Sequence, residues 1–381
     1  MKKALVHDWF KDFGGAERCV ESFTNIWDDF EIYSLIDFLS DKNREVILKG
    51  KKVNTSFIQN FPKAKTKYRN YLPFFPLAIE QFDLTEYEVI LSSSHAVAKG
   101  VLTRPDQLHI SYVYSPIRYA WDLHFQYLRE SGLDKGWKGW LAKYFLHKIR
   151  LWDFSTANRV DHYIAISHYI AKRIEKIYGK KADVIYPPVD TASFKIGDIT
   201  ENYYVTSSRM VPYKKMDLIV EAMSKTNHKL IVIGAGPDWK KVKSKAGNNI
   251  ELLGHQSFEN MIRIIQKSKA YIFAAEEDFG IAPIEAQACG IPVIAFGKGG
   301  TLETIVGEFT NEKNVKETDT GIFFEEQSVQ SLLSAVELFE KEHEKFNKNI
   351  IRTNALRFSK ERFEKEFEQK INLIYKEWKK R

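Results

Sequence analysis

The chain has 381 residues, of which 44% are hydrophobic and 28% charged, and its formal net charge is +7. At about 150 residues per domain, this length predicts two globular domains. The two cysteines, Cys19 and Cys289, have no neighbouring ligand cluster, so neither a disulfide framework nor a zinc site is expected. The positive charge favours anionic partners, which are nucleic acid, anionic lipid or phosphorylated small molecules.

Targeting and membrane segments are not expected. The first apolar run, residues 4–6, is interrupted too early for a secretory signal. No stretch approaches the roughly 18 apolar residues of a membrane-spanning helix. We therefore expect a cytoplasmic protein, or one that is peripheral at the inner face of the cytoplasmic membrane.

Short β-branched and aromatic runs alternate with longer segments of helical spacing, a pattern typical of parallel βαβ units. The first half predicts strands at Ala4–His7, Glu31–Leu35, Glu88–Ser92, His109–Tyr114, Tyr163–Ile166 and Val184–Tyr186. The second half predicts strands at Tyr203–Ser207, Lys229–Ile233, Ile250–Leu253, Ala270–Phe273, Pro292–Ala295 and Gly321–Phe324. Between the two series, Pro187 and Pro188 mark a domain boundary, because proline continues neither a helix nor a central strand.

The sequence thus predicts an α/β fold with two Rossmann-like, doubly wound domains, 1–187 and 188–359. The last helix, Lys360–Trp378, is amphipathic and needs a surface to cover, so we expect segment 360–381 to cross back and pack on the first domain. In open α/β sheets, ligands bind beyond the carboxyl ends of the strands. Function is therefore expected in the loops after the strands, in a cleft between the two domains.

Two glutamates, Glu277 and Glu285, bracket a predicted helix start after strand Ala270–Phe273. Gly280 permits a tight turn, and Pro283 suits the first helical turn. Free N–H groups and the helix dipole favour a phosphate at such a place, and flanking carboxylates accept hydrogen bonds from neutral hydroxyls. Taken alone, the pair also fits a solvated loop residue and a first-turn glutamate.

Two cations, Arg209 and Lys214, lie between strand Tyr203–Ser207 and the next predicted helix, so both can reach the same edge of the sheet. Departure of a diphosphate requires charge neutralisation, which two cations can provide where many transferases use magnesium. Because the chain has no Asp-x-Asp motif, we expect no metal and no other cofactor. Taken singly, each cation also fits a solvated surface charge.

Two glycine turns and one histidine follow other predicted strands. Gly234 and Gly236 form a turn after Lys229–Ile233, and Gly14 and Gly15 follow the first strand, where they let backbone approach a ligand closely. His95 follows strand Glu88–Ser92. A lone histidine is more often a structural hydrogen-bonding group than a catalytic one, and that alternative stays open.

The segment 273–287, Phe-Ala-Ala-Glu-Glu-Asp-Phe-Gly-Ile-Ala-Pro-Ile-Glu-Ala-Gln, resembles the signature of glycosyltransferase family 4, retaining enzymes of the GT-B fold. The resemblance implies that Glu277 contacts the donor sugar and Glu285 the ribose hydroxyls. It implies that the backbone of Phe279, Gly280 and Ile281 contacts the phosphate or the sugar.

The resemblance extends to the other loops. It implies that Arg209 and Lys214 form the diphosphate site and that His95 lies near the reacting centre. It places the following glycines in the donor or acceptor cleft: Gly14, Gly15, Gly234 and Gly236.

Residues 112–122 resemble the Pro-x-Arg-Tyr-x-Trp-Asp stretch of bacterial polysaccharide mannosyltransferases, which implies acceptor-binding roles for Arg118 and Asp122. Tyr114 stands where those relatives often have histidine, which weakens an acid/base role there. The implied reaction is retaining transfer of a hexose, mannose from GDP-mannose, to a lipid-linked glycan or polysaccharide acceptor in bacterial surface-polysaccharide synthesis, including O-antigen and lipopolysaccharide.

Three alternatives stay open. One is a UDP-sugar donor. Another is a non-catalytic nucleotide-sugar-binding protein, which transfer or hydrolysis activity would exclude. The third is a basic nucleic-acid binder, which is disfavoured because no recognised binding module accompanies the charge.

Two segments, 63–75 and 137–152, are both basic and aromatic. In the second, seven residues are predicted to share one helical face: Trp137, Trp140, Leu141, Tyr144, Phe145, Ile149 and Trp152. Such a helix either lies at an anionic membrane interface and meets a lipid-linked acceptor, or packs in the first domain with solvated lysines. The sequence favours neither.

Overall fold

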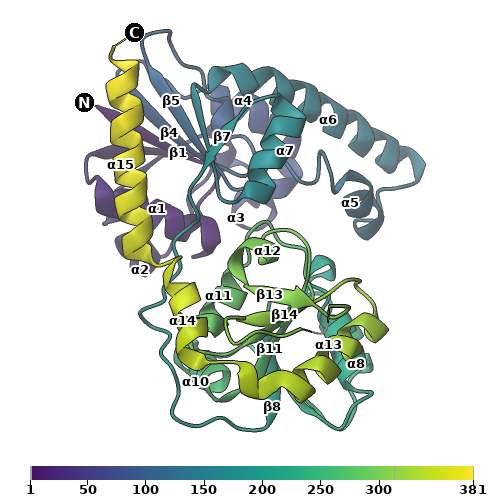
Figure 1. Cartoon of the computed structure of the whole chain (residues 1–381). Coiled ribbons are helices and arrows are strands. Elements are labelled where there is room, and N and C mark those ends of the chain that lie inside the picture. Colours follow the sequence, from purple (N-terminus) through teal and green to yellow (C-terminus); the bar gives the residue numbers. More distant parts are fainter. Residues whose placement is uncertain (1, 313, 381) are drawn as a thin grey trace. The chain divides into compact units, whose positions relative to one another are not determined.

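The computed structural model describes residues 2–312 and 314–380, and the chain forms two compact units (Figure 1). The N-terminal unit comprises Met1–Pro188 and Phe363–Arg381, and the C-terminal unit comprises Val189–Arg362. The first crossing between the units therefore falls directly after the proline pair.

The N-terminal unit is built on a seven-stranded sheet with the order β3-β2-β1-β4-β5-β6-β7, in which all pairs are parallel. Its strands are β1 Lys3–His7, β2 Phe30–Ser34, β3 Val53–Thr55, β4 Val89–Ser94, β5 Leu108–Val113, β6 His162–Ala165 and β7 Ala182–Val184. Its helices are α1 Gly15–Ile26, α2 Asp41–Leu48, α3 Ala64–Lys67, α4 Phe75–Glu80, α5 His124–Glu130, α6 Gly136–Ser155 and α7 His168–Tyr178.

The C-terminal unit repeats this plan, with a seven-stranded parallel sheet of order β10-β9-β8-β11-β12-β14-β13. Its strands are β8 Tyr203–Ser207, β9 Lys229–Ile233, β10 Ile250–Gly254, β11 Ala270–Phe273, β12 Val293–Phe296, β13 Gly307–Phe309 and β14 Gly321–Phe324. Its helices are α8 Met216–Met223, α9 Trp239–Ser244, α10 Phe258–Lys267, α11 Ile281–Ala288, α12 Thr301–Thr304, α13 Val329–Glu342 and α14 Lys348–Leu356.

The predicted α/β class with two doubly wound sheets is confirmed, and most predicted strands are present. Two edge strands, β3 and β13, were not predicted, because three residues are too few to show a period. The prediction of a strand at Val184–Tyr186 was wrong by two residues, since β7 ends at Val184. Ile185 is buried, which is why it resembles a strand residue in the sequence. Its carbonyl accepts a hydrogen bond from the Tyr112 hydroxyl at 2.9 Å and not from a neighbouring strand.

The last helix, α15 Lys360–Trp378, lies beside α1 in Figure 1. Its residues Phe363 and Phe367 are one helical turn apart and fully buried. The ring of Phe367 lies 4.6 Å from that of Phe23 on α1 and 5.7 Å from that of Tyr112 on β5. Through these aromatic contacts, the end of the chain completes the core of the N-terminal unit.

Within residues 2–312 and 314–380, no helix is both long enough and apolar enough to cross a bilayer.

Candidate active site

Each sheet has a central point from which the chain adds strands first to one side and then to the other. In the N-terminal unit it lies between β1 and β4, and in the C-terminal unit between β8 and β11. Ligands of open α/β sheets bind at such switch points, beyond the carboxyl ends of the strands. The loops after these four strands carry most of the predicted site residues, so the topology gathers them into one group per unit.

In the C-terminal unit, the two predicted loops meet through Lys214 and Glu277. The ammonium Nζ of Lys214 lies 2.5 Å from Oε1 of Glu277, and about a fifth of each side chain is exposed. Lys214 also lies over the ring of Phe273, the last residue of β11, at 5.8 Å from its centroid. A cation and an anion predicted to contact the same substrate are therefore neighbours at the switch point.

The strands beneath these loops are tied together by Tyr271, a fully buried residue of β11. Its hydroxyl donates to the carbonyl of Ser207 at 2.8 Å, and Ser207 is the last residue of β8. Arg209 follows two residues later and is exposed. The hydrogen bond from Tyr271 therefore fixes the start of the loop that carries Arg209. Because Arg209 is exposed, it is accessible to an anionic ligand.

The glycine turn after β9 supports the cationic loop by close backbone contact. Gly234 has φ +130°, and a Cβ there would lie 1.9 Å from the carbonyl oxygen of Ser208. A Cβ on Gly236 would lie 2.3 Å from the carbonyl oxygen of Met210. The Met210 amide donates to the Ala235 carbonyl at 2.9 Å. Neither position has room for a Cβ. Glycine at both positions therefore lets the loop around Arg209 lie against this turn.

The glutamate loop is held by a second pair of glycines, Gly299 and Gly300, which follow β12. The carbonyl of Glu277 accepts from the amide of Gly300 at 2.8 Å. A Cβ on Gly299 would lie 2.5 Å from that carbonyl oxygen, and a Cβ on Gly300 would lie 2.4 Å from the Cα of Phe279. The backbone that carries Glu277 therefore packs directly on this turn.

The predicted helix start after Glu277 is present as α11. Gly280 precedes the helix with φ +95°, and Ile281 is its first residue. Phe279 is buried with its ring 5.5 Å from that of Phe358. Glu285 lies in the helix and is buried, with 7% of its surface exposed. A nearly buried carboxylate is not the solvated first-turn glutamate of the alternative interpretation.

In the N-terminal unit, the loops after β1 and β4 are joined by Asp8. Its fully buried carboxylate accepts hydrogen bonds from the four consecutive amides of residues 95–98, at 2.6–2.9 Å. The same carboxylate lies 3.1 Å from Nδ1 of His95. The ring of His95 packs edge-on against Trp9 at 4.3 Å and remains about a quarter exposed. His95 is thus held at the switch point with part of its ring accessible.

A second buried chain of polar groups supports this loop. His7 contacts the Ser93 hydroxyl at 3.0 Å, Ser93 contacts the Tyr114 hydroxyl at 2.8 Å, and Tyr114 donates to the Ala16 carbonyl at 3.0 Å. Burial raises the pKa of Tyr114 well above its usual range. Tyr114 is therefore a neutral structural hydrogen-bonding group here.

The glycine pair of the first loop begins α1. Gly14 precedes the helix, and its amide donates to Glu17 Oε2 at 3.0 Å. Gly15 is the first helical residue. Burial raises the pKa of Glu17, but the contact with His7 and the backbone outweighs it, so that the pKa lies below its usual value. Glu17 is thus an anion, and its carboxylate pairs with the backbone amide of Gly14 at the amino end of α1.

The two acceptor candidates lie on one segment of the N-terminal unit. Asp122 is exposed and forms an ion pair with Arg173 on α7. Arg118 is partly buried. Between them, the indole of Trp121 donates to Asp153 at 2.7 Å, and Asp153 forms a buried ion pair with Lys99 at 2.9 Å. The segment that carries both candidates is therefore anchored to α6.

Four residues that position the site were not predicted from the sequence, namely Asp8, Glu17, Gly299 and Gly300. Asp8 carried a usable signal, because an acidic residue directly after a buried first strand lies at the switch point. The other three are recognised only by their contacts, since Gly299 and Gly300 act on a loop that is more than 20 residues away in sequence.

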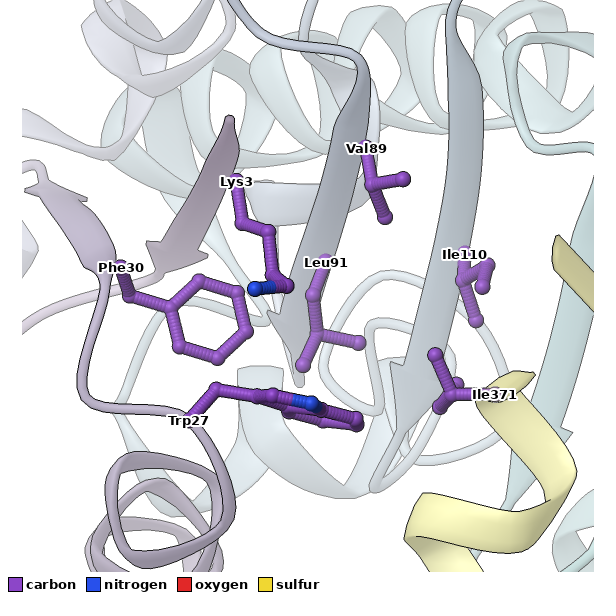
Figure 2. A pocket seen from close by; sticks show the side chains of 7 residues that line it. All are labelled: Lys3, Trp27, Phe30, Val89, Leu91, Ile110 and Ile371. Carbon is purple, nitrogen blue, oxygen red and sulfur yellow. The ribbon is translucent and has the colours of Figure 1, made fainter. Parts of the chain in front are cut away.

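Figure 2 shows a small pocket in the N-terminal unit, lined by Lys3, Trp27, Phe30, Val89, Leu91, Ile110 and Ile371. Lys3 and Val89 begin β1 and β4, whereas the site residues follow the ends of these strands. The Lys3 ammonium is paired with Asp29 at 2.5 Å. We interpret this apolar pocket as incomplete packing beneath α15, away from the candidate site.

In the described part of the chain, no group of three or more His, Cys, Asp and Glu side chains is arranged to hold a metal ion.

Two family models match adjacent parts of the chain. The model for Glycosyltransferase Family 4 matches residues 13–193, and the model for Glycosyl transferases group 1 matches residues 190–356. These ranges contain both groups of predicted site residues.

Curated relatives match over part of the chain. An uncharacterized glycosyltransferase of Methanocaldococcus jannaschii is 29% identical over 42% of this chain and 48% of its own length. A GDP-mannose-dependent monoacylated alpha-(1-6)-phosphatidylinositol monomannoside mannosyltransferase of Corynebacterium glutamicum is 27% identical over 38% of this chain and 47% of its own. The match thus spans about half the length of each relative.

Solved structures resemble the whole chain. The Anabaena protein HepE in complex with UDP and glucose has a TM-score of 0.68 at 17% identity, over 98% of this chain and 100% of that one. Sucrose-phosphate synthase from Thermosynechococcus elongatus has a TM-score of 0.69 at 13% identity, over 98% and 99%. At such identities the likeness shows the fold, which is the two-domain GT-B arrangement of Rossmann-like units.

Proposed function

Because the chain belongs to the family 4 glycosyltransferases of the GT-B fold, we propose that it is a retaining hexosyltransferase with a nucleoside diphosphate-sugar donor. The observation that carries this proposal is the meeting of Lys214 and Glu277 at the switch point of the C-terminal sheet, 2.5 Å apart. In this ion pair the two charges neutralise each other. A bound donor offers each of them another partner, which is the anionic diphosphate for Lys214 and the hydroxyl donors of the sugar for Glu277.

The proposed donor is GDP-mannose. The Corynebacterium glutamicum relative is named for this donor, and the segment 276–287 resembles that of mannosyltransferases. A UDP-sugar is the second candidate, because the structurally similar HepE was solved with UDP and glucose.

In the proposed reaction, the bond between the anomeric carbon and the leaving phosphate oxygen breaks, and charge accumulates on the diphosphate. Arg209 binds it through its planar fork and Lys214 as a point charge, which performs the neutralisation that a metal ion provides elsewhere. We therefore propose a metal-independent enzyme. The acceptor oxygen bonds to the anomeric carbon on the face that the phosphate leaves, and the leaving phosphate takes the proton of the acceptor hydroxyl. Because the new bond forms on the same face, the anomeric configuration is retained.

The remaining residues orient the donor. We propose that Glu277 accepts hydrogen bonds from the sugar hydroxyls, Glu285 from the ribose, and that His95 contacts the sugar near the reacting carbon. The backbone of 279–281 and the glycine turns at 14–15 and 234–236 line the donor. Arg118 and Asp122 are proposed for the acceptor, with Asp122 exchanging its ion pair with Arg173.

The proposed acceptor is a lipid-linked glycan or polysaccharide of bacterial surface-polysaccharide synthesis. The Corynebacterium glutamicum relative is named for a lipid acceptor, a phosphatidylinositol monomannoside. A lipid-linked acceptor locates the reaction at the inner face of the cytoplasmic membrane.

A thermal-shift comparison of GDP, UDP, GDP-mannose and UDP-glucose tests the donor. A ligand that binds only the folded chain stabilises it by about 2.7 kcal/mol at 100 times its Kd. We expect the largest rise in Tm with GDP and GDP-mannose, and no rise with GDP in Lys214→Ala. No rise with any nucleotide, together with no sugar transfer, would refute the proposal. Binding without transfer or hydrolysis would leave the non-catalytic alternative.

A further inference from the structure

Helix α6 carries an aromatic face that none of the described residues covers. Trp137 and Trp140 are 73% and 69% exposed. Further exposed apolar residues recur at helical spacing along the same side: Leu141, Tyr144, Leu151 and Phe154. From Trp137 to Phe154 this face extends about 26 Å at 1.5 Å per residue. In Figure 1, the amino-terminal end of α6 extends beyond the sheet of the unit.

The predicted single face of residues 137–152 was therefore wrong in its composition. Leu146 and Ile149 are buried against Leu128 of α5, and Trp152 packs on the core near α4. The buried and exposed apolar residues lie on different sides of the helix. The core needs only the buried side, so packing does not explain the tryptophans of the other.

The charges of this helix are one-sided. Lys138, Lys143 and Lys148 are exposed, while Asp153, the acidic residue of α6, is fully buried in its ion pair with Lys99. Every charge that α6 presents to solvent is therefore positive at neutral pH.

Lysine and aromatic residues are combined along this face. The Lys138 ammonium lies 5.7 Å from the ring centroid of Trp137, and that of Lys148 lies 5.6 Å from the ring centroid of Tyr144. Lysines extend their charged ends from an apolar surface towards water or phosphate. Trp and Tyr rings favour the boundary between acyl chains and headgroups.

From these observations we propose that the exposed face of α6, together with the exposed Phe125 of the neighbouring helix α5, docks the protein on an anionic lipid surface. This deepens the proposed function, on which it rests, because it names the surface through which a transferase reaches a lipid-linked acceptor. Phe125 is 69% exposed, and α5 packs on α6 through Leu128. A protein partner fits less well, since lysine is depleted in protein interfaces.

Vesicle co-sedimentation of the full chain tests this proposal. We expect binding to phosphatidylcholine vesicles that contain phosphatidylglycerol, weaker binding at high salt, and little binding to phosphatidylcholine alone. The double variant Trp137→Ser/Trp140→Ser should lower the partition coefficient at least tenfold. Its matched control is Ile199→Ser, which removes an apolar residue that is 62% exposed in the C-terminal unit.

The lysines are tested separately with Lys138→Gln/Lys148→Gln. Each lysine near an anionic surface contributes about 1 kcal/mol, or about fivefold in binding, so the pair should lose roughly 25-fold. The control Lys240→Gln, an exposed lysine of α9, should bind as the original chain does. Equal binding of the tryptophan or lysine variants and their controls would overturn the proposal.

Two further measurements separate this proposal from the proposed function. Nucleotide binding without vesicles should be unchanged in the α6 variants. If the chain binds anionic vesicles through α6 but transfers no sugar, docking stands and the transferase assignment fails. If the chain shows no vesicle binding, and ultracentrifugation finds a dimer that Trp140→Ser dissociates, the face serves a second copy and membrane docking is refuted.

Discussion

Asp8 holds His95 twice, because its carboxylate lies 3.1 Å from Nδ1 of the imidazole and also accepts the backbone amide of His95. A carboxylate at this distance stabilises the proton on Nδ1, which leaves Nε2 as a hydrogen-bond acceptor. Burial lowers the pKa of His95 below its usual value and outweighs the opposite effect of Asp8. His95 is therefore neutral at pH 7 and suited to accept a hydrogen bond from a sugar hydroxyl.

A pH dependence follows from this arrangement. The groups that act on His95 are Asp8 and Glu17, which raise its pKa, and His7 and Arg69, which lower it. Because the neutral form is needed, kcat/KM should be constant above about pH 6.5 and fall as the pH drops through the lowered pKa of His95. In Asp8→Asn a raising influence is lost, so the acidic fall should move to lower pH.

Asp8→Asn should also destabilise the fold by about 1–3 kcal/mol, since an amide leaves some of the four backbone donors unpaired. The control Asp12→Asn changes an exposed carboxylate on the same loop and should change neither stability nor the pH profile. An acidic fall that stays in place or moves to higher pH in Asp8→Asn would contradict the assigned role.

The Lys214–Glu277 pair predicts strongly coupled variants. Lys214→Ala and Glu277→Gln should each lower kcat/KM by about 100-fold or more, the usual effect of removing one group that stabilises transition-state charge. The double variant should lie close to the worse single variant, because both act on one bound donor. Steady-state kinetics of all three, with thermal melting as a folding control, measure this.

Neighbouring residues provide matched controls for that pair. Lys215→Ala removes the adjacent lysine, and Glu276→Gln removes the adjacent glutamate, which pairs with Lys298 at 3.2 Å. Both should retain most of the activity. Full activity in Lys214→Ala or Glu277→Gln would end the assignment of the donor site.

The glycine turn offers a test of loop positioning. In Gly234→Ala the new Cβ meets the Ser208 carbonyl and the residue keeps a φ that suits only glycine. The strain should cost roughly 1–3 kcal/mol of unfolding free energy, and displacement of the loop around Arg209 should weaken GDP binding. Gly254→Ala is the control, because Gly254 also has a positive φ but no atom within 4 Å of the added Cβ. Nucleotide titration should find weaker GDP binding in Gly234→Ala than in Gly254→Ala. Equal affinity of the two variants would mean that the turn does not position Arg209.

The closing helix should make a large contribution to stability. Phe367→Ala removes a buried ring that contacts Phe23 and Tyr112, and this should lower the unfolding free energy by about 3–5 kcal/mol in denaturant titration. Leu373→Ala, on the exposed side of the same helix, should change it by less than about 0.5 kcal/mol. Similar losses in the two variants would mean that α15 does not depend on this contact.

The sequence alone determined the elements whose signals are local. Strands Tyr203–Ser207, Lys229–Ile233, Ala270–Phe273 and Gly321–Phe324 and the helix Lys360–Trp378 were predicted at the residues where they occur. Alternation and helical spacing are carried by neighbouring residues, so no knowledge of distant contacts is needed. The loop motifs are also local, and the family that they resemble is the one whose models match the chain.

Only the tertiary structure decided which of these residues meet. The order of parallel strands brings β8 beside β11 and β1 beside β4, and so joins Lys214 to Glu277 and Asp8 to His95 across more than 60 residues of sequence. It also divided the apolar residues of α6 into a buried side and an exposed one. Periodicity shows that a helix has an apolar side, but the neighbours that cover it come from elsewhere in the chain.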